Sequence, residues 1–403
     1  MTTLLADAKP AGVRVDGAPL LVILLALAGG AAALSSLISL PQALLFLTGG
    51  LLGLALYHGS FGFTGGWKRF ATEGRSRAMR VQLLMIGVTA IVFIPLMSGA
   101  VDTGQTYAGA WAPVGVSVVF GAFLFGTGMQ LGGGCGSGTL FSVGGGSARM
   151  LVTLAGFIFG AAIGTWHLPF WLALPSLPVV RFGADFGAFG GTLLTLAGLA
   201  AIVGLLAVVE QRRHGNVESI FSGAQDLTPA RFLHGPWPLI LSALVLALGN
   251  VLTLLLAGHP WSVTYGFGLW GAKLLAAAGV PVADWTFWQI PAQARALERS
   301  VLFDVTSVMN FGILLGAALA AALAGRFAPK VAVPLLSWIA ALLGGLLMGY
   351  GARLSFGCNI GALFSGIASG SLHGWVWFGL AFLGSLVGIF LRPLFGLDGF
   401  RKA

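Results

Sequence analysis

Two stretches of the chain, LGGGCGSGTLF (Leu131–Phe141) and LSFGCNIGALF (Leu354–Phe364), place a cysteine in the same glycine-rich frame. Cys135 and Cys358 are the two cysteines of the 403-residue chain. The offset that relates them also relates neighbouring residues: Gly126 to Gly349, Gly128 to Gly351, Leu131 to Leu354, Gly134 to Gly357, Gly138 to Gly361, and Leu140–Ser142 to Leu363–Ser365. The agreement indicates an internal repeat, because glycine-rich segments that resemble each other by chance would not share so many positions.

The composition determines the class of protein. Hydrophobic residues make up 57% of the chain and charged residues 8%, whereas soluble domains carry about 25% charged residues. Apolar runs of about 18–20 residues recur along the chain, which is the length that a helix needs to cross a bilayer. The runs are continuous and do not alternate as the strands of a β-barrel do. The sequence therefore predicts an all-α polytopic membrane protein that lies in a lipid bilayer.

We expect about ten spans, with a polar linker at 210–236 between a first membrane half (19–209) and a second (237–395). A segment at 1–18 precedes the first half, and a tail at 396–403 follows the second. The expected spans are residues 19–37, 40–58, 80–98, 113–131, 149–167, 187–209, 237–257, 300–325, 332–353 and 372–392.

The net charge of +9 comes mostly from short connecting segments, as the positive-inside rule describes. We therefore expect no nucleic-acid partner. Counting spans puts three basic clusters on one side of the membrane, which predicts a bacterial inner-membrane protein with that side, and both termini, in the cytoplasm. The clusters are Lys68, Arg69, Arg75, Arg77 and Arg80; Arg212 and Arg213; and Arg326 and Lys330.

Two glycine- and aromatic-rich segments, Gly59–Phe70 and Trp261–Leu274, are apolar enough to enter the membrane but poorly suited to cross it. Each lies early in a set of four spans in which a cysteine loop separates the last two spans. Spans two to five therefore match spans seven to ten, and spans one and six are extra. In the first set the cysteine loop follows a span that runs from outside to inside. In the second set it follows a span that runs from inside to outside. The sequence thus predicts two inverted repeats, typical of transporters with a site at the midplane.

The cysteine loops have the features of a solute path. Three consecutive glycines at 132–134 are expected to end a helix inside the membrane, where irregular backbone is tolerated only if protein covers it or it lines a cavity. Short helices are expected after both cysteines, and a helix N-terminus favours an anion. A thiol is a weak donor and a polarizable partner for a sulfur-bearing ion. The predicted path residues in the loops are Cys135, Cys358, Gly134, Gly136, Gly357 and Asn359.

Several residues outside the loops have two interpretations. Lys273 lies in a segment that could dip into the membrane, so it is either a further path residue or a side chain that extends to the interface. Asp304 and Asn310 are expected to face the protein interior and to form structural hydrogen bonds. His58 ends the second span, and we expect it to be an interfacial residue. The tryptophans are also expected mostly at the membrane interface, namely Trp171, Trp261, Trp270, Trp375 and Trp377.

Both G-x-G-x-x-L-x-x-G-C-x-x-G-x-L-F frames and the stretch GFTGGWKRF resemble the YeeE/YedE family of sulfur-transport membrane proteins, which includes bacterial thiosulfate uptake proteins. The resemblance covers nearly the whole chain. It implies an hourglass-shaped inverted-repeat protein, not an enzyme, that hands thiosulfate along central cysteines through S–H···S contacts without net covalent chemistry. The best-known thiosulfate carriers have a further cysteine in an earlier loop, which this chain lacks, so sulfide, persulfide or a selenium species stay open as substrates.

We therefore predict a permease that moves a small inorganic sulfur anion inward through Cys135 and Cys358, with a cytoplasmic sulfur-carrier or sulfurtransferase protein as a candidate partner. The alternative is a membrane thiol redox protein. Two cysteines are too few for a structural zinc site, and we expect no metal or other cofactor. The sequence has no G-x-x-x-x-G-K-[ST] motif, so ATP hydrolysis by this chain is not expected to drive transport.

Overall fold

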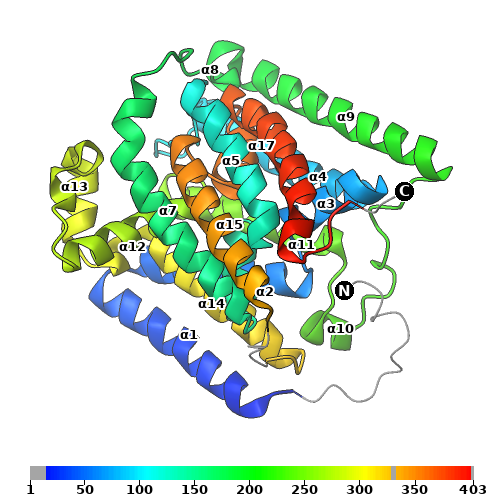
Figure 1. Cartoon of the computed structure of the whole chain (residues 1–403), viewed down its shortest axis with the longest axis horizontal. Coiled ribbons are helices and arrows are strands. Elements are labelled where there is room, and N and C mark those ends of the chain that lie inside the picture. The colour runs from blue at the N-terminus through cyan, green and yellow to red at the C-terminus, as the bar shows by residue number, and fades with distance from the viewer. Residues whose placement is uncertain (1–14, 328–332, 401–403) are drawn as a thin grey trace.

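The computed structural model describes residues 15–327 and 333–400, and within these ranges the chain is helical without any strand (Figure 1). Ten segments contain helices that are long and apolar enough to cross a membrane, which confirms the all-α polytopic fold. The long helices are α1 (Gly17–Leu37), α2 (Leu40–His58), α4 (Arg77–Met97), α5 (Val116–Gly132), α7 (Ala148–Leu172), α9 (Gly187–His214), α11 (Leu239–Ala257), α14 (Val305–Leu323), α15 (Leu335–Leu354) and α17 (Leu372–Leu391).

Short helices occupy the two glycine- and aromatic-rich segments and the two cysteine loops. They are α3 (Phe63–Glu73), α6 (Gly136–Gly144), α12 (Thr264–Ala277), and the π-helix η4 (Asn359–Ser365), which α16 (Gly366–Ala368) continues. The longest of them, α12, has 14 residues and a length of about 21 Å at 1.5 Å per residue. A hydrocarbon core is about 30 Å thick, so none of these helices crosses it alone.

The connections on the two sides carry the remaining elements. They are α8 (Phe182–Asp185), α10 (Pro229–His234), α13 (Pro291–Glu298), and the 3₁₀ turns η1 (Val282–Asp284), η2 (Thr286–Gln289), η3 (Val301–Phe303) and η5 (Arg392–Phe395). Helix α9 continues through Glu210 to His214, so the first five residues of the expected linker at 210–236 are helical.

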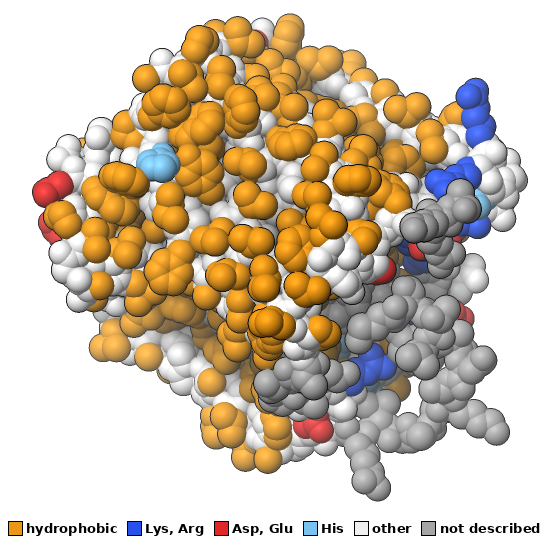
Figure 2. Space-filling model, in the orientation of Figure 1, with side chains coloured by type: hydrophobic (Ala, Val, Ile, Leu, Met, Phe, Trp, Pro, Cys, Tyr) orange, Lys and Arg blue, Asp and Glu red, His pale blue; other side chains and the backbone are white. Residues whose placement is uncertain are grey.

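Helices α5 and α15 pack against each other at the centre of the molecule. Helix α7 runs along α15 and α17 runs along α5, while α14 packs on α2 and α11 packs on α4. Helices α1 and α9 lie at opposite edges in Figure 1, and most of their side chains are exposed. Figure 2 shows hydrophobic side chains over most of one face of the molecule, as a lipid-facing surface requires.

Glycines bring the backbones of α5 and α15 into contact. A Cβ atom on Gly128 would lie 2.6 Å from the carbonyl oxygen of Gly344, and one on Gly351 would lie 2.4 Å from that of Gly121. Gly121 and Gly344 are related by the same offset as the two cysteines, and so are Gly128 and Gly351. Small residues allow membrane helices to approach this closely, and here they do so in matched pairs.

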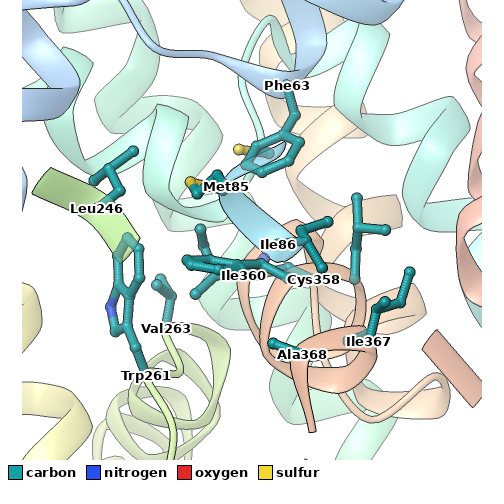
Figure 3. Packing of buried hydrophobic residues seen from close by; sticks show 14 of the residues in the cluster. Phe63, Met85, Ile86, Leu246, Trp261, Val263, Cys358, Ile360, Ile367 and Ala368 are labelled. Atoms are coloured by element: carbon teal, nitrogen blue, oxygen red, sulfur yellow. Dashed lines mark hydrogen bonds between the residues drawn. The ribbon is translucent and has the colours of Figure 1, made fainter. Parts of the chain in front are cut away.

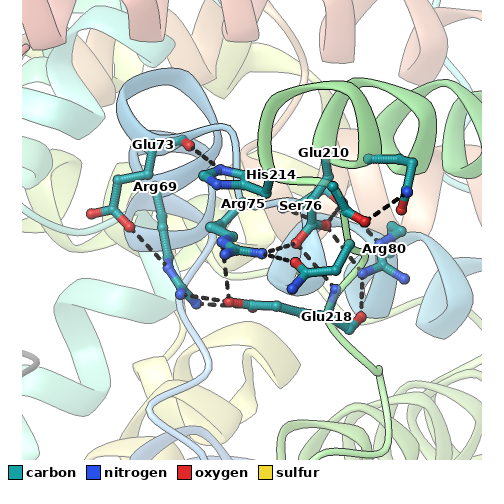
Figure 4. A network of polar contacts seen from close by, with 11 residues as sticks. Arg69, Glu73, Arg75, Ser76, Arg80, Glu210, His214 and Glu218 are labelled. Carbon is teal, nitrogen blue, oxygen red and sulfur yellow. Dashed lines mark hydrogen bonds and ion pairs between the residues drawn. The ribbon is translucent and has the colours of Figure 1, made fainter.

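The basic clusters gather at one end of the molecule. Buried Glu210 accepts hydrogen bonds from the hydroxyl of Ser76 at 2.6 Å and from the guanidinium groups of Arg75 and Arg80, both at 3.3 Å (Figure 4). This network joins the start of α4 to the end of α9. Arg326 lies near the same end, because His234 of the linker hydrogen-bonds to the end of α14. Lys330 lies outside the described residues.

The interfacial role expected for the tryptophans is wrong for Trp261 and Trp377, whose side chains have no exposed surface. The indole of Trp377 donates a hydrogen bond to Ser355 Oγ at 3.0 Å. Buried indoles usually find such a partner, whereas Nε1 of Trp261 has none among the described residues; both rings fill the interior of the helix bundle. A hydrophobic span with a tryptophan near its end does not reveal whether lipid or protein surrounds the ring.

We predict that Gly344→Ala destabilises the protein by about 1–3 kcal/mol, because overpacking costs that much and the new Cβ would lie 2.1 Å from the Gly132 nitrogen. The midpoint of thermal unfolding in detergent measures the effect. Gly204→Ala in α9 is the matched control, since no atom lies within 4 Å of its added Cβ and alanine favours a helix interior by about 0.5–1 kcal/mol. Equal midpoints for the two variants would contradict the close packing of α5 on α15.

Candidate functional site

Helix α5 ends inside the molecule, and two arginines satisfy its last carbonyl groups. Gly133 ends the helix with φ +87°, a left-handed conformation that glycine adopts without steric cost. Arg149 donates to the carbonyl oxygens of Leu131 and Gly132 at 2.7 and 2.6 Å. Arg392 donates to the carbonyl oxygen of Gln130 at 2.5 Å. Positive charge at a helix C-terminus is favourable, so these two side chains fix the point at which the first cysteine loop begins.

Cys135 caps the N-terminus of α6 with its thiol. The Sγ atom accepts a hydrogen bond from the backbone N–H of Gly138 at 3.4 Å and lies 3.5 Å from the hydroxyl oxygen of Ser137. Serine or threonine usually fills this position. The side chain is 1% exposed, so the thiol lies in the protein interior and also completes the helix.

The second loop repeats this cap with different support. Cys358 precedes η4, and its Sγ accepts from the backbone N–H of Ile360 at 3.4 Å. Gly357 has φ +151°, and a Cβ there would lie 2.7 Å from the nitrogen of Ala362, so the turn requires glycine. Ser355 Oγ donates to the Gly351 carbonyl at 2.7 Å at the end of α15. The short helices expected after both cysteines are thus present.

The two loops touch each other. A Cβ atom on Gly136 would lie 3.2 Å from Sγ of Cys358 and 3.5 Å from Cγ1 of Val263, so α6, the second loop and the start of α12 meet at one point. Figure 3 shows Cys358 beside Val263 and Ile360. Both cysteines are free thiols and buried, and Gly136 is the residue that lets the loops approach.

Amide side chains hold the two glycine- and aromatic-rich segments in equivalent ways. Asn310 of α14 donates to the carbonyl oxygen of Val263, the residue before α12, at 2.9 Å. Gln82 of α4 donates to the carbonyl oxygen of Gly62, the residue before α3, at 3.3 Å. The structural hydrogen bond expected for Asn310 is therefore confirmed. The corresponding role of Gln82 has no sequence signal beyond a polar residue within an apolar span.

Asn359 differs from these amides because neither its Oδ1 nor its Nδ2 atom has a hydrogen-bond partner among the described residues, although the side chain is fully buried. A buried unpaired amide costs about 1–3 kcal/mol. It is adjacent to Cys358 in the chain, at the start of η4. Its amide therefore offers two donors and an acceptor that the folded chain leaves unused.

Five of the predicted path residues, the two cysteines with Gly136, Gly357 and Asn359, lie in loops that contact each other. Gly134 lies in the first loop, where an added Cβ would be 2.8 Å from the Cε atom of Met150 and 3.1 Å from the carbonyl carbon of Gly138. Glycine at this position allows α6 to fold back beneath the end of α5.

Lys273 has other partners. Its ammonium group donates to the carbonyl oxygens of Leu297 and Arg299, at 2.5 and 2.6 Å, where α13 ends. These bonds stabilise a connection on the side opposite the basic clusters. A place for Lys273 in the path stays a prediction, and its contacts give it a structural role at a helix C-terminus.

Arg149 and Arg392 were not selected from the sequence, although both shape the site. An arginine in or beside a membrane span must find acceptors in the protein, and that rule points to Arg149 at the start of α7. The sequence does not reveal that its acceptors are the carbonyl groups that end α5.

A family model for sulphur transport matches residues 58–387. The chain belongs to this family. It is a family of transporters and not of enzymes, so the chain is a multi-pass membrane protein of a sulfur-transporter family. The matched residues include both cysteine loops and all four short helices.

Named relatives of the family match the chain to different extents. The probable transporter YedE of Escherichia coli is 34% identical over 148 residues, and the match spans about a third of each protein (34% of this chain and 35% of YedE). The thiosulfate transporter TsuA of Spirochaeta thermophila is 26% identical over 82% of this chain and 92% of its own length. TsuA of Escherichia coli is 23% identical over 84% of this chain and 90% of its own length.

We predict that Arg149→Gln lowers the thermal midpoint, because carbonyl groups at the end of α5 would lose their donors and each buried unpaired group costs about 1–3 kcal/mol. Arg295→Gln is the matched control, since it removes the same charge from an exposed position on α13. The thermal midpoints of the two purified variants check this. A midpoint for Arg149→Gln that equals that of the control would show that the arginine does not hold the loop.

Proposed function

We propose that the protein is a permease that carries a small sulfur-containing anion, thiosulfate foremost, inward across the bacterial inner membrane along a path between Cys135 and Cys358. The observation that carries the proposal is the contact between the loops, in which Gly136 packs against Sγ of Cys358. Two relatives that match most of this chain are named thiosulfate transporters, which supports the choice of substrate.

The chemistry of the loops suits a thiosulfate ion. Each Sγ accepts a backbone N–H, so its S–H hydrogen points elsewhere and can donate to the terminal sulfur of the ion. The free amide of Asn359 adds N–H donors for an oxygen atom. Backbone N–H groups at the start of α6 favour negative charge. The ion would leave unchanged, because hydrogen-bond donation forms no covalent bond.

The packing of the helices supports two inverted repeats over 19–209 and 237–395. In such repeats, each contact between a helix of one half and a helix of the other has a counterpart with the halves exchanged. Helices α7 and α15 pair as α17 and α5 do, and α2 and α14 pair as α11 and α4 do. The reciprocal glycine contacts of α5 and α15 follow the same rule. Helices α1 and α9 are then the two extra helices, which lie outside the matched sets of four spans.

The end of the molecule with the basic clusters is the proposed cytoplasmic side. The linker at 210–236 and both termini would lie there, and a cytoplasmic sulfur-carrier or sulfurtransferase protein would receive the anion. Sulfide, persulfide and selenium anions could use the same thiols, so competition with thiosulfate uptake determines which of them the protein accepts.

We predict that Cys135→Ser and Cys358→Ser each lower thiosulfate uptake at least about tenfold and leave the thermal midpoint near that of the parent. A serine hydroxyl keeps the N-terminal cap but removes the soft S–H donor. The corresponding alanine variants lose the cap as well, which costs about 0.5–2 kcal/mol. Uptake of labelled thiosulfate by a sulfur-auxotrophic host is the measurement. Serine variants that transport at the parental rate would refute a path through the thiols.

The proposed orientation has its own test. We expect a fluorescent protein fused after Ala403 to fluoresce and alkaline phosphatase at the same site to be inactive, because fluorescence requires a cytoplasmic position and the phosphatase an external one. Alkaline phosphatase inserted after Gly279, between α12 and η1, should be active. The opposite pattern would reverse the orientation.

A further inference from the structure

A cavity of about 280 Å³ lies at the end of α6 that is remote from Cys135. Its wall includes Tyr57 and His58 from the end of α2, Phe141 from α6, His234 from the linker and Arg326 beyond α14. The volume is enough for a small oxyanion together with several water molecules. None of the residues described as lining it is acidic.

The charges and hydrogen-bond donors of the wall favour an anion. Arg326 is permanently charged, and no described side chain accepts a hydrogen bond from its guanidinium group. His58 is 3% exposed, and its Nε2 atom has no partner among the described residues. Buried polar atoms are rarely left unpaired, so this nitrogen is available to a water molecule or an ion that enters the cavity.

His234 adds a second ring nitrogen. Its Nδ1 atom lies 2.8 Å from the carbonyl oxygen of Leu323; because a carbonyl can only accept, Nδ1 carries the proton. The Nε2 atom of the neutral ring then carries a lone pair and can accept a hydrogen bond from a water molecule that an anion binds in turn. Two imidazoles and a guanidinium thus face a space without a carboxylate.

Helix α6 connects the cavity to the cysteine loops. It has nine residues and a length of about 14 Å, with the thiol of Cys135 at its start and Phe141 in the cavity wall. Tyr57 packs on its far end, because a Cβ on Gly145 would lie 2.4 Å from the Cε2 atom of Tyr57. Helix α6 thus extends from the first cysteine loop to the wall of this cavity.

We propose that the cavity binds a small sulfur oxyanion through Arg326, His58 and His234, as a second station between the cysteine loops and the basic end of the molecule. The inference rests on the proposed function, because it takes the transported anion as the ligand. A phosphate group of a lipid has similar chemistry, so the experiment separates the two sources.

Thiosulfate binding to the purified full-length Cys135→Ser/Cys358→Ser protein isolates the cavity from the thiols. We expect calorimetry in nanodiscs of phosphatidylcholine to show one site. Adding Arg326→Gln should weaken its binding about tenfold or more. Arg212→Gln, which removes an exposed charge from the same end, should leave binding unchanged. In transport by otherwise unmodified protein, Arg326→Gln should raise the KM for thiosulfate about tenfold.

Equal affinity in the Arg326→Gln and Arg212→Gln proteins would overturn the proposal. A second result would also overturn it: phosphatidylglycerol raises the thermal midpoint only when Arg326 is present, and thiosulfate does not bind. The occupant of the cavity would then be a lipid headgroup. His58→Gln should weaken thiosulfate binding as Arg326→Gln does. If the protein with buried His58 replaced does not fold, the variant at exposed Arg326 still tests the proposal. Full thiosulfate uptake by the Cys→Ser variants would refute the path through the thiols. Arg326-dependent binding of thiosulfate would in that case still support the cavity site.

Discussion

A helix that ends within a bilayer leaves carbonyl groups that lipid cannot hydrate, and the first cysteine loop depends on how this constraint is met. Arg149 and Arg392 come from two other helices and donate to three consecutive carbonyl groups at the end of α5. With these groups satisfied, Gly133 can reverse the chain and α6 can start inside the protein. The thiol of Cys135 then completes the other end of the break by accepting a backbone N–H.

The second loop meets the same constraint without an arginine. Ser355 donates to the end of α15 and accepts from Trp377, while nearby Arg353 lies over the ring of Phe287, 3.7 Å from its centre. The two cysteine loops differ in this way because the two ends of the molecule differ in charge. Asp398 pairs with both Lys68 and Arg392, so the first break lies toward the end that carries the basic clusters. Cations concentrated at one end attract an anion to that end of a path.

The apolar runs were sufficient to predict the spans, and the glycine frames around Cys135 and Cys358 predicted the short helices with the thiols at their starts, because glycine runs and apolar length are local properties. The carbonyl partners of Arg149 could not be predicted, since they belong to a different helix. Trp377 was misassigned because hydropathy does not distinguish a ring in lipid from one inside a bundle. His58 ends its helix as expected, but its burial against the linker depends on a segment almost two hundred residues later.

What the two halves share and what they do not share have different consequences for transport. The shared features are the thiol caps, the glycine contacts of α5 with α15, and the amides of Gln82 and Asn310. Along the proposed path, these features would offer the anion similar contacts from either side. A path that is symmetric in this way does not by itself favour one side of the membrane over the other. A difference in how tightly the two sides hold the ion would have to come from unduplicated residues such as Arg326 and His234. In the proposed permease, the asymmetric end of the molecule would therefore set the affinity on its side, while the duplicated centre would select the ion.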